Sequence, residues 1–493
     1  MKAIKSSAAI IGSGVAGLAT SIRLAAKGMS VHVFEKNSYP GGKLSEIRVG
    51  KYRFDAGPSL FTMPQYLEDT FRSAGLNLSD YFSYTRHPTA CHYFWDDGIF
   101  LPANGNLSSF AEKVEEVLGV PKSRILKYMQ NARFTYEKTG RIFLEKSLHK
   151  WSTWLSHDTL KAIAFFPRYQ ITSTLHDVNE KWLEHPKLVQ LFDRFATYNG
   201  SDPYQTPGIM HIIPHFEHNV GTFFPVGGMH AITKALYNAA IDLGVHFHFD
   251  SKVERIHLTS DYATGLDVNG EFIPFDLVVS NMDVVPTYRH LIPDAPQPQK
   301  ILDYPRSSSA LIFYWGIKHQ FPELDMHNIF FSNDYKEEFN CIFNKKTVYD
   351  DPTVYINITS RWNPEDAPEG ADNWFVMVNV PGNTGQDWDD LLKKTRNNVL
   401  KKLSKRLDAD ISALIEAEAT LDPRSIESKT YSYQGSLYGA GSNDIFSAFA
   451  RHPNFHKKIR NLYFCGGSVH PGGGIPLCLL SARIVSDLID THS

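Results

Sequence analysis

The chain has 493 residues, with 53 acidic and 50 basic side chains and a formal net charge of −3. This length is sufficient for two or three domains around a large core, and the balanced charge excludes a general affinity for nucleic acid. The four cysteines form no CxxC pair, the 21 histidines show no ligand spacing, and no apolar run reaches about 18 residues. We therefore expect no disulfide framework, no metal site and no membrane-spanning helix.

A glycine-rich turn follows the first apolar stretch, Ala8–Ile11. It reads Gly12-Ser13-Gly14-Val15-Ala16-Gly17 and leads into an alanine-rich helix. The first glycine permits a tight turn, the second lets a phosphate approach the backbone, and the third lets the helix pack close to the strand. The helix N-terminus then offers free N–H groups to a pyrophosphate. Because glycines interrupt the apolar run, we do not expect a secretory signal peptide here.

The second strand, Val31–Phe34, ends at an acidic residue, Glu35. A carboxylate at this position is placed to accept a hydrogen bond from a ribose hydroxyl of a dinucleotide. Gly41-Gly42-Lys43 and the turn Gly57-Pro58-Ser59-Leu60 follow. These features predict a dinucleotide site, but the first glycine turn alone does not distinguish FAD from NAD.

Residues 65 to 221 have a mostly helical pattern. Within it, Leu144, Leu148, Trp151 and Leu155 recur at helical spacing, with further aromatic and basic residues up to Arg168. Tryptophan and phenylalanine beside lysine and arginine are typical of an element at a membrane interface. A buried core helix with a solvated basic face would give the same spacing, so both interpretations stay open.

Strand and helix patterns then alternate again, with a helix at 230–243, strands near 245–249 and 275–280, and a strand beginning at Val253. This alternation is similar to that of the first 60 residues, which predicts one nucleotide-binding domain built from separated segments. Residues 307–420 instead contain four β-rich segments and a helix pattern at 388–406. They predict an antiparallel sheet with one face available to a ligand.

A second glycine turn, Gly466–Pro476, follows the strand 461–465 and opens a helix at 477–489. A second helix N-terminus at a glycine turn predicts a second contact with the same extended cofactor. A dehydrogenase that binds NAD does not need such a turn at its far C-terminus. The pair of turns therefore favours FAD.

The chain resembles the bacterial-type FAD-dependent carotenoid desaturases, which are relatives of the amine oxidase flavoproteins. The resemblance runs nearly from end to end, and its most specific part is the C-terminal turn. The motifs that carry it are Gly12-x-Gly14-x-x-Gly17 with Glu35, Gly41-Gly42-Lys43, Asp55-x-Gly57-Pro58-Ser59, Phe224-Pro-x-Gly-Gly228, Gly435-Ser-x-Tyr438-Gly439 and Gly466-Gly467-x-x-His470-Pro-Gly-Gly-Gly474-Ile-Pro476.

The resemblance implies an α/β fold with a Rossmann-like FAD-binding domain built from discontinuous segments. It also implies a substrate domain with an antiparallel β-sheet and a helical, membrane-facing region. We expect residues 1–90, 222–300 and 425–493 in the FAD-binding domain, 91–221 in the helical part and 301–424 in the β-sheet part. The expected cofactor-binding residues are Gly12, Ser13, Gly14, Ala16, Gly17, Glu35, Lys36, Gly41, Gly42, Lys43, Leu44, Gly57, Pro58, Ser59, Leu60, Val253, Asn281, Gly466, Gly467, Gly474, Ile475 and Pro476.

The segment from Arg194 to Tyr204 looks like the subgroup that introduces a 3,4 double bond into 1-hydroxylated carotenoids. Desaturases that form lycopene from phytoene look very similar, and a flavin-dependent isomerase or saturase, or a carotenoid binder without activity, are further alternatives. The resemblance implies a carotenoid substrate and oxygen or a quinone as electron acceptor. It also implies a cytoplasmic enzyme bound peripherally to the inner face of the membrane.

A hydrocarbon substrate requires a hydride acceptor, which a flavin supplies and side chains do not. The accompanying proton requires only a weak base or water. Glu217, in His215-Phe-Glu217-His218, matches an acidic position of the family pattern and is the candidate catalytic group. The alternative is a structural carboxylate paired with a neighbouring histidine or arginine.

Overall fold

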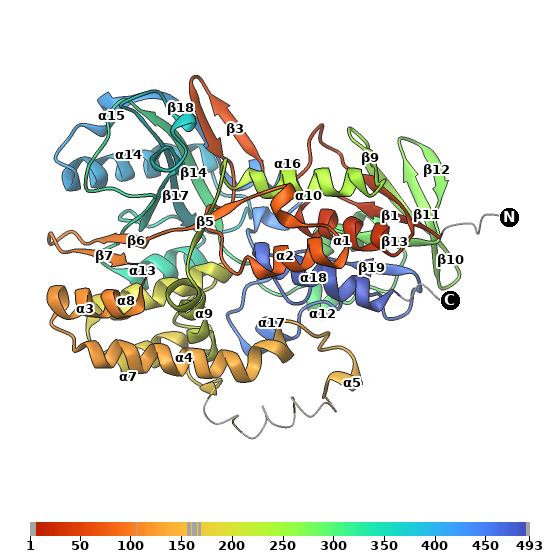
Figure 1. The fold of residues 1–493 in the computed structure, drawn as a ribbon, viewed down its shortest axis with the longest axis horizontal. Coiled ribbons are helices and arrows are strands. Elements are labelled where there is room, and N and C mark those ends of the chain that lie inside the picture. The colour runs from red at the N-terminus through yellow and green to blue at the C-terminus, as the bar shows by residue number, and fades with distance from the viewer. Residues whose placement is uncertain (1–5, 105, 155–158, 160–164, 166–168, 490–493) are drawn as a thin grey trace.

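The computed structural model describes residues 6–104, 106–154, 159, 165 and 169–489. A five-stranded parallel sheet, with strand order β19-β13-β1-β2-β9, forms one half of the molecule (Figure 1). Its strands come from three distant parts of the chain, as expected for a domain built from separated segments. They are β1 (Ser7–Ile11), β2 (Ser30–Phe34), β9 (His246–His248), β13 (Leu277–Ser280) and β19 (Leu462–Phe464).

Helices cover one face of this sheet, and a small antiparallel sheet covers the other. The helices share one apolar core with the strands, because their alanine- and leucine-rich faces turn inward. They are α1 (Val15–Ala26), α2 (Gln65–Ser73), α10 (His230–Asp242) and α18 (Ile475–Leu488). The small sheet packs through a second core and consists of β10 (Val253–Thr259), β11 (Tyr262–Val268) and β12 (Glu271–Pro274).

A seven-stranded sheet, with strand order β18-β14-β17-β16-β15-β6-β7, forms the other half. Helices α14 (Trp388–Arg406) and α15 (Ile411–Leu414) pack on one of its faces. The sheet is antiparallel as expected except at the β15–β6 pair, which is parallel. Its strands are β6 (Thr89–Phe94), β7 (Phe100–Asn104), β14 (Ser309–Ile317), β15 (His327–Phe330), β16 (Val354–Ile358), β17 (Asp372–Val380) and β18 (Ile415–Leu421).

The expectation of a mostly helical stretch from residue 65 is wrong for residues 84–104. There the chain forms β6 and β7, which extend the seven-stranded sheet, and β5 (Tyr84–Arg86), which pairs with β8 (Phe223–Pro225). Aromatic residues in these strands, such as Tyr93, reach complete burial only through partners distant in sequence. The domain boundaries given above stay a prediction.

Helices packed beneath β6 and β7 share a third apolar core with these two strands. The helical spacing of Leu144, Leu148, Trp151 and Leu155 does not correspond to one helix, because α4 ends at Phe143 and, among the described residues 144–154, only Trp151–Trp154 (α5) is helical. Leu155 lies outside the described residues. The helices of this part are α3 (Leu107–Leu118), α4 (Lys122–Phe143), α7 (Leu175–Leu183), α8 (Pro186–Asp193) and α9 (Ile213–His215).

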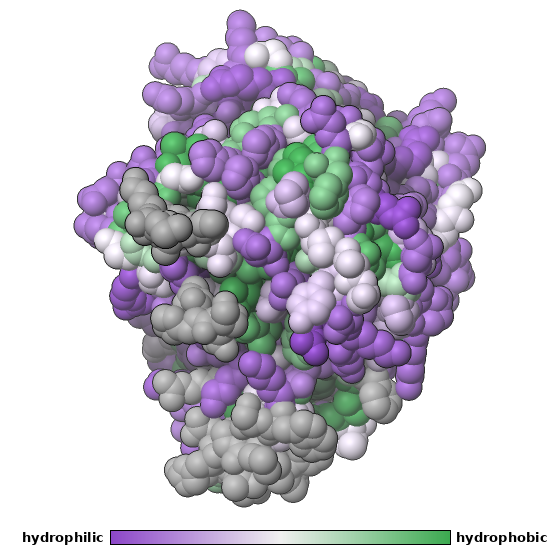
Figure 2. Space-filling model, turned by 90° about the vertical axis from the view of Figure 1, so that its right-hand side faces the viewer, coloured by the Kyte–Doolittle hydropathy of each residue, from purple (hydrophilic) through white to green (hydrophobic). Residues whose placement is uncertain are grey.

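The remaining short elements connect the three parts. They are β3 (Glu46–Val49), β4 (Tyr52–Asp55), α11 (Val284–Pro286), α12 (Gln299–Leu302), α13 (Tyr335–Asn340), α16 (Pro423–Thr430) and α17 (Ile445–Phe449). In the described part of the chain, no helix is long and apolar enough to cross a membrane. The end of the molecule that carries β10–β12 has a mostly hydrophilic surface, in which exposed apolar residues such as Phe272 are interspersed (Figure 2).

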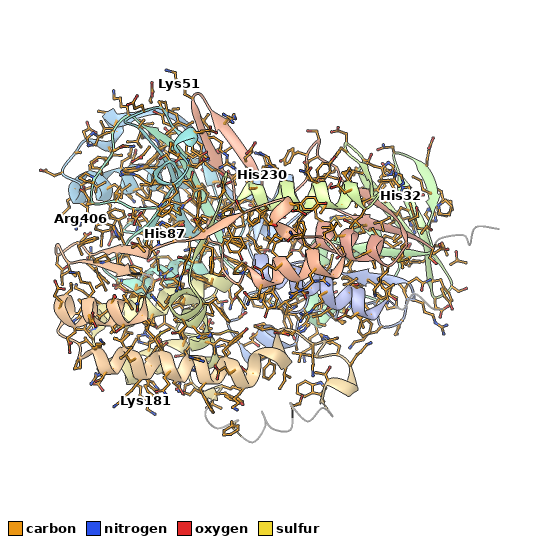
Figure 3. The ribbon with its side chains drawn as sticks, viewed as in Figure 1. His32, Lys51, His87, Lys181, His230 and Arg406 are labelled. Atoms are coloured by element: carbon orange, nitrogen blue, oxygen red, sulfur yellow. The ribbon has the colours of Figure 1, made fainter. Side chains whose placement is uncertain are left out.

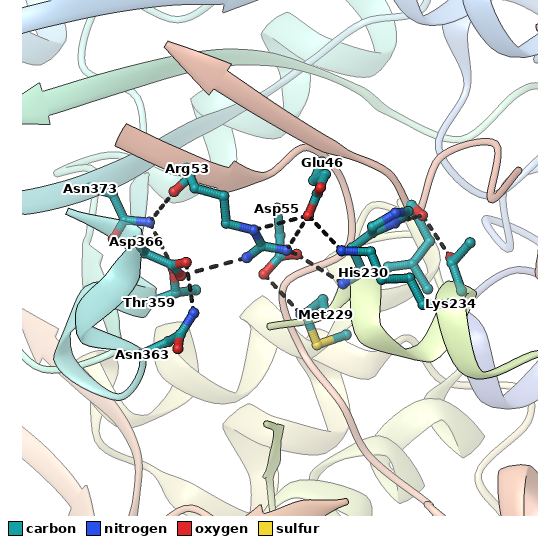
Figure 4. Close-up of polar contacts among 12 residues, drawn as sticks. Glu46, Arg53, Asp55, Met229, His230, Lys234, Thr359, Asn363, Asp366 and Asn373 are labelled. Carbon is teal, nitrogen blue, oxygen red and sulfur yellow. Dashed lines mark hydrogen bonds and ion pairs between the residues drawn. The ribbon is translucent and has the colours of Figure 1, made fainter. Parts of the chain in front are cut away.

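A buried ion-pair network joins the two halves (Figure 4). Arg53 on β4 donates to Asp55 at 2.7 Å and to Glu46 at 3.2 Å, and it lies 3.5 Å from Asp366 beside the seven-stranded sheet. Asp55 in turn accepts from the backbone N–H groups of Met229 and His230, both at 2.9 Å, where α10 begins. His230 lies between the two halves (Figure 3). One carboxylate thus binds the arginine and caps a helix of the parallel-sheet half.

Replacing Arg53 with methionine is expected to destabilise the protein by about 3–5 kcal/mol, because two buried carboxylates lose their cation. The measurement is the thermal denaturation midpoint. Arg255→Met is the matched control, since Arg255 pairs with Asp294 at the surface, where such pairs contribute about 0–1 kcal/mol. Equal midpoints for the two variants would contradict the structural role of the network.

Candidate functional site

One cavity of about 600 Å³ connects both glycine turns with the inner face of the seven-stranded sheet. Its walls at one end include Gly12, Gly14 and Glu35, and at the other end Tyr355 and Phe375. The cavity therefore runs from the parallel-sheet half into the other half. A volume in this range is typical of cofactor and small-molecule sites.

Two helix N-termini open into this cavity. Helix α1 begins after Gly14 and α18 begins after Gly474, and no side chain caps either of them. The N–H groups of a first helical turn have no partner within the helix, so they are available to an anion. A Cβ on Gly14 would lie 2.8 Å from Asn281 Nδ2, so a larger residue here would displace the Asn281 side chain. The geometry fits the phosphate groups of an extended dinucleotide.

The Glu35 carboxylate holds the first glycine turn in place. It accepts from the backbone N–H and the hydroxyl of Ser13, both at 2.9 Å, and from the backbone and side chain of Asn37 at 3.0 and 2.8 Å. These four donors match the acceptor capacity of a carboxylate. Glu35 is buried and also lines the cavity, so a ribose hydroxyl would share an acceptor that already orders the turn.

All of the expected cofactor-binding residues line the cavity except Ser13 and Gly17. Ser13 is completely buried and turned toward Glu35. Gly17 lies behind the turn, where an added Cβ would be 2.2 Å from the carbonyl oxygen of Gly12. Both residues therefore shape the turn from behind, and their direct contact with a cofactor stays a prediction.

Lys43 is one of the basic residues that line the cavity. Its Nζ donates to the carbonyl oxygens of Ser436 and Leu437, both at 2.9 Å. Burial lowers the pKa of Lys43 to about 8, although the charge of Asp283 opposes this shift. Lys36 also lines the cavity, and its ammonium donates to the Ser428 carbonyl and lies 3.8 Å from the Tyr431 ring centre.

Several residues that line the cavity were not among the site residues predicted from the sequence. Tyr438 belongs to the Gly435–Gly439 motif, which offered a signal for it. The others come from loops and strands whose proximity only the fold creates. These residues are Tyr39, Lys252, Asp283, His327, Tyr355, Tyr431 and Tyr438.

The part of the cavity over the seven-stranded sheet is largely apolar. Successive strands contribute Ile312 and Tyr314, Ile329, and Phe375 and Met377. Side chains that alternate along each strand put these residues on one face. The opposite face carries the α14 core, so the sheet offers one apolar surface to a ligand, as the sequence predicted.

Glu217 lies in this part of the cavity within a buried polar cluster. Its carboxylate accepts from Arg194 Nη2 at 3.3 Å, from the Tyr93 hydroxyl at 3.3 Å and from the Tyr198 hydroxyl. The pairing with arginine that the structural interpretation required is therefore present. Because Glu217, Arg194 and Tyr198 also line the cavity, this pairing leaves the catalytic interpretation a prediction.

Similarity to known proteins extends over almost the whole chain. Residues 15–490 match the family model for flavin-containing amine oxidoreductases. The chain belongs to this family. The cofactor of the site is accordingly FAD, and the two uncapped helix N-termini and the continuous cavity fit it. The family assignment also makes the chain an FAD-dependent oxidoreductase.

Two relatives and one solved structure refine this placement. The chain is 53% identical over 482 residues to 1-hydroxycarotenoid 3,4-desaturase from Flavobacterium sp. (strain P99-3), which covers 98% of both proteins. It is 30% identical over 489 residues to 4,4′-diapolycopene oxygenase from Methylomonas sp., covering 97% of both. An oxidoreductase from Methanosarcina mazei has the same fold, with a TM-score of 0.63, 14% identity, and coverage of 98% of this chain and 100% of its own.

Replacing Glu35 with alanine is expected to weaken FAD binding by about 1.5–3 kcal/mol, because a charged acceptor is lost from the glycine turn. The measurement is the FAD released by denaturation from equal amounts of purified protein. Glu254→Ala is the control, since Glu254 is an exposed carboxylate on β10 beside Val253. Full FAD occupancy in a folded Glu35→Ala protein would contradict the assignment.

Proposed function

We propose that this chain is a carotenoid desaturase. It introduces a C-3,4 (3′,4′) double bond into a carotenoid with a hydroxylated acyclic end, such as 1′-hydroxy-γ-carotene. The observation that carries the proposal is the 53% identity over 98% of both chains to an enzyme named for this reaction. The cavity supports it, because a cofactor region opens directly onto an apolar surface that suits a polyene.

In the reaction a CH₂–CH₂ unit loses a hydride and a proton, and its carbon–carbon single bond becomes a double bond. When bound, FAD supplies the hydride acceptor that no side chain can provide. The residues of the chain hold the polyene against the sheet through Ile312, Phe375 and Met377 and exclude water from it. Glu217 Oε2 receives the proton, for which a weak base suffices because the donor is a cation.

The residues assigned to FAD follow the course of the cavity. The turn Gly12–Gly17 would hold the pyrophosphate, Glu35 the adenosine ribose, and Val253 the adenine through its backbone. Gly41–Lys43 would contact the phosphates and the ribityl chain. Gly57–Leu60, Gly466, Gly467 and Gly474–Pro476 would lie near the ring end of the cofactor.

Supplying purified enzyme with 1′-hydroxy-γ-carotene, γ-carotene and phytoene in separate incubations, with oxygen or a quinone provided as electron acceptor, is expected to give product only from the first. The expected signs are a lengthened polyene chromophore and consumption of an electron acceptor, oxygen or a quinone. Conversion of phytoene alone would make the chain a phytoene desaturase. An unchanged chromophore length with altered geometry would indicate an isomerase, and a shortened chromophore would indicate a saturase.

The enzyme works at a membrane surface, on the inner face and from the cytoplasmic side, because carotenoids partition into the bilayer. We assign docking to the region from Trp151 to Arg168. The exposed Lys150 directly precedes this region, and the described part of the region contains Trp154, which is 41% exposed. Lys161 and Arg168 lie outside the described residues. Exposed tryptophan beside lysine suits the interface between headgroups and acyl chains.

Liposome flotation is expected to carry the protein to the lipid fraction, and more strongly with anionic lipid, since basic residues flank the docking region. The variant Lys150→Glu/Lys161→Glu/Arg168→Glu is expected to lose most of this flotation. Reversal of three basic residues on α14, Lys393, Lys401 and Lys405, is the matched control. If both variants float like the wild type and desaturate liposomal substrate, docking occurs elsewhere on the surface.

A further inference from the structure

A substrate that carries a tertiary hydroxyl presents one polar group to an otherwise apolar surface. A buried hydroxyl without a partner costs free energy, and a site built to bind one rejects the analogue that lacks it. The polar residues that line the cavity include two hydrogen-bonded groups, the Arg194–Tyr198–Glu217 cluster and a group formed by Ser59, Tyr355 and His327.

The group formed by Ser59, Tyr355 and His327 is connected by short hydrogen bonds. The Tyr355 hydroxyl lies 2.8 Å from Ser59 Oγ and 2.7 Å from His327 Nδ1. Asn357 Nδ2 donates to the Met326 carbonyl at 3.0 Å and lies 3.3 Å from the same His327 Nδ1. A neutral ring nitrogen has one lone pair, so we place the ring proton on Nε2 and assign the lone pair of Nδ1 to the shorter contact, the one with the Tyr355 hydroxyl.

This tautomer fixes the direction of the remaining bonds. The Tyr355 hydroxyl donates to His327 Nδ1, so the Tyr355 oxygen acts as an acceptor. Ser59 occupies one of its acceptor positions, and a second position remains. Burial, aided by electrostatic interactions with His87 and Arg194, lowers the pKa of His327 to about 3. Burial also raises the pKa of Tyr355 well above its usual range, so both groups are neutral near pH 7.

The position of this group matches the geometry of the reaction. Ser59 belongs to the Gly57–Leu60 turn that we assign to the ring end of FAD, and Tyr355 lies on β16 directly opposite. Only three bonds separate the oxygen of a C-1 hydroxyl from C-3. A residue that binds this hydroxyl must therefore lie beside the reacting carbons.

The Arg194 cluster is less suited to accept this hydrogen bond, because its carboxylate and its two tyrosine hydroxyls already bind one another. The hydroxyls of Tyr93 and Tyr198 donate to Glu217, and Arg194 Nη2 donates to Tyr93 at 2.9 Å. Arg194 Nε has no hydrogen-bond partner among the described residues. The cluster therefore offers a hydrogen-bond donor, and the test below includes it as the alternative site for the hydroxyl.

We propose that Tyr355, oriented by His327 and Ser59, accepts the hydrogen bond of the substrate's tertiary hydroxyl and thereby selects hydroxylated carotenoids. The proposal rests on the desaturase function proposed above. Tyr355 is then a specificity-determining residue of the site. It fixes which end of the polyene reaches the cofactor, while the apolar walls bind the rest without regard to the hydroxyl.

The test compares kcat/KM for 1′-hydroxy-γ-carotene and γ-carotene in the same liposomes. Tyr355→Phe removes only the hydroxyl and is expected to lower the ratio of the two values at least about ten-fold, mainly through a higher KM for the hydroxylated substrate. If γ-carotene is not converted, its inhibition constant replaces its kcat/KM and is expected to stay unchanged. Tyr314→Phe is the matched control, because the Tyr314 hydroxyl donates a hydrogen bond to the Ala56 carbonyl at 2.7 Å. This control variant should change kcat/KM for both carotenoids by the same factor.

Other outcomes separate the two levels of the proposal. A wild-type enzyme that binds FAD but leaves 1′-hydroxy-γ-carotene unconverted would contradict the desaturase function itself. An active Tyr355→Phe enzyme with an unchanged ratio, especially if Tyr198→Phe lowers that ratio, would overturn the role of Tyr355 and assign recognition to the Arg194 cluster. If Tyr355→Phe does not fold, as judged by its FAD content, His327→Leu tests the same orientation and is expected to lower the ratio too.

Discussion

The buried contact between Arg53 and Asp55 determines how the two halves of the molecule meet. Asp55 ends β4, binds Arg53 beside it and accepts from the N–H groups that begin α10. Arg53 also forms ion pairs with Glu46 and Asp366. Asn373 of the seven-stranded sheet donates to the backbone carbonyl of Arg53 at 2.7 Å. Charges removed from water are stable only when each finds a partner. The strand that precedes Gly57 is therefore held at a fixed position between a helix of one half and a sheet of the other.

The position of this strand determines the position of the turn that follows it, Gly57–Leu60. The Tyr314 hydroxyl holds the Ala56 carbonyl, and Ser59 is held by Tyr355, so strands of the seven-stranded sheet bind the turn at both ends. A Cβ on Gly57 would lie 1.8 Å from the Lys43 carbonyl, which leaves no space for any other residue. The cofactor region and the apolar surface thus share one wall. Free backbone donors and lysine ammonium groups line the cavity on one side of this wall, and aromatic and aliphatic side chains line it on the other.

The parts that could be predicted from the sequence are those with local causes. Gly12 has a positive φ of 93°, a requirement that its place in the glycine-rich turn reveals, and the helix 388–406 follows from its periodicity and was found over Trp388–Arg406. The strands at 84–104 could not be recognised, because their partners lie on β15 and β8. Likewise Tyr355 and His327 are ordinary strand residues until the fold brings them to Ser59. A local sequence pattern does not indicate contacts between residues that are distant in sequence.

The proposed chemistry also explains why Glu217 and Arg194 lie together. Loss of a hydride leaves positive charge spread over the polyene, and an unpaired guanidinium in the same apolar cavity would oppose it, since charges interact strongly at low dielectric. Glu217, 3.3 Å from Arg194 and hydrogen-bonded to Tyr198, cancels that charge. In the proposed reaction, the pair can then remain beside the substrate without repelling the cation, and the Glu217 carboxylate would receive the proton. Recognition of the hydroxyl by the neutral Tyr355–His327 pair follows the same logic, because it adds no net charge where the cation forms.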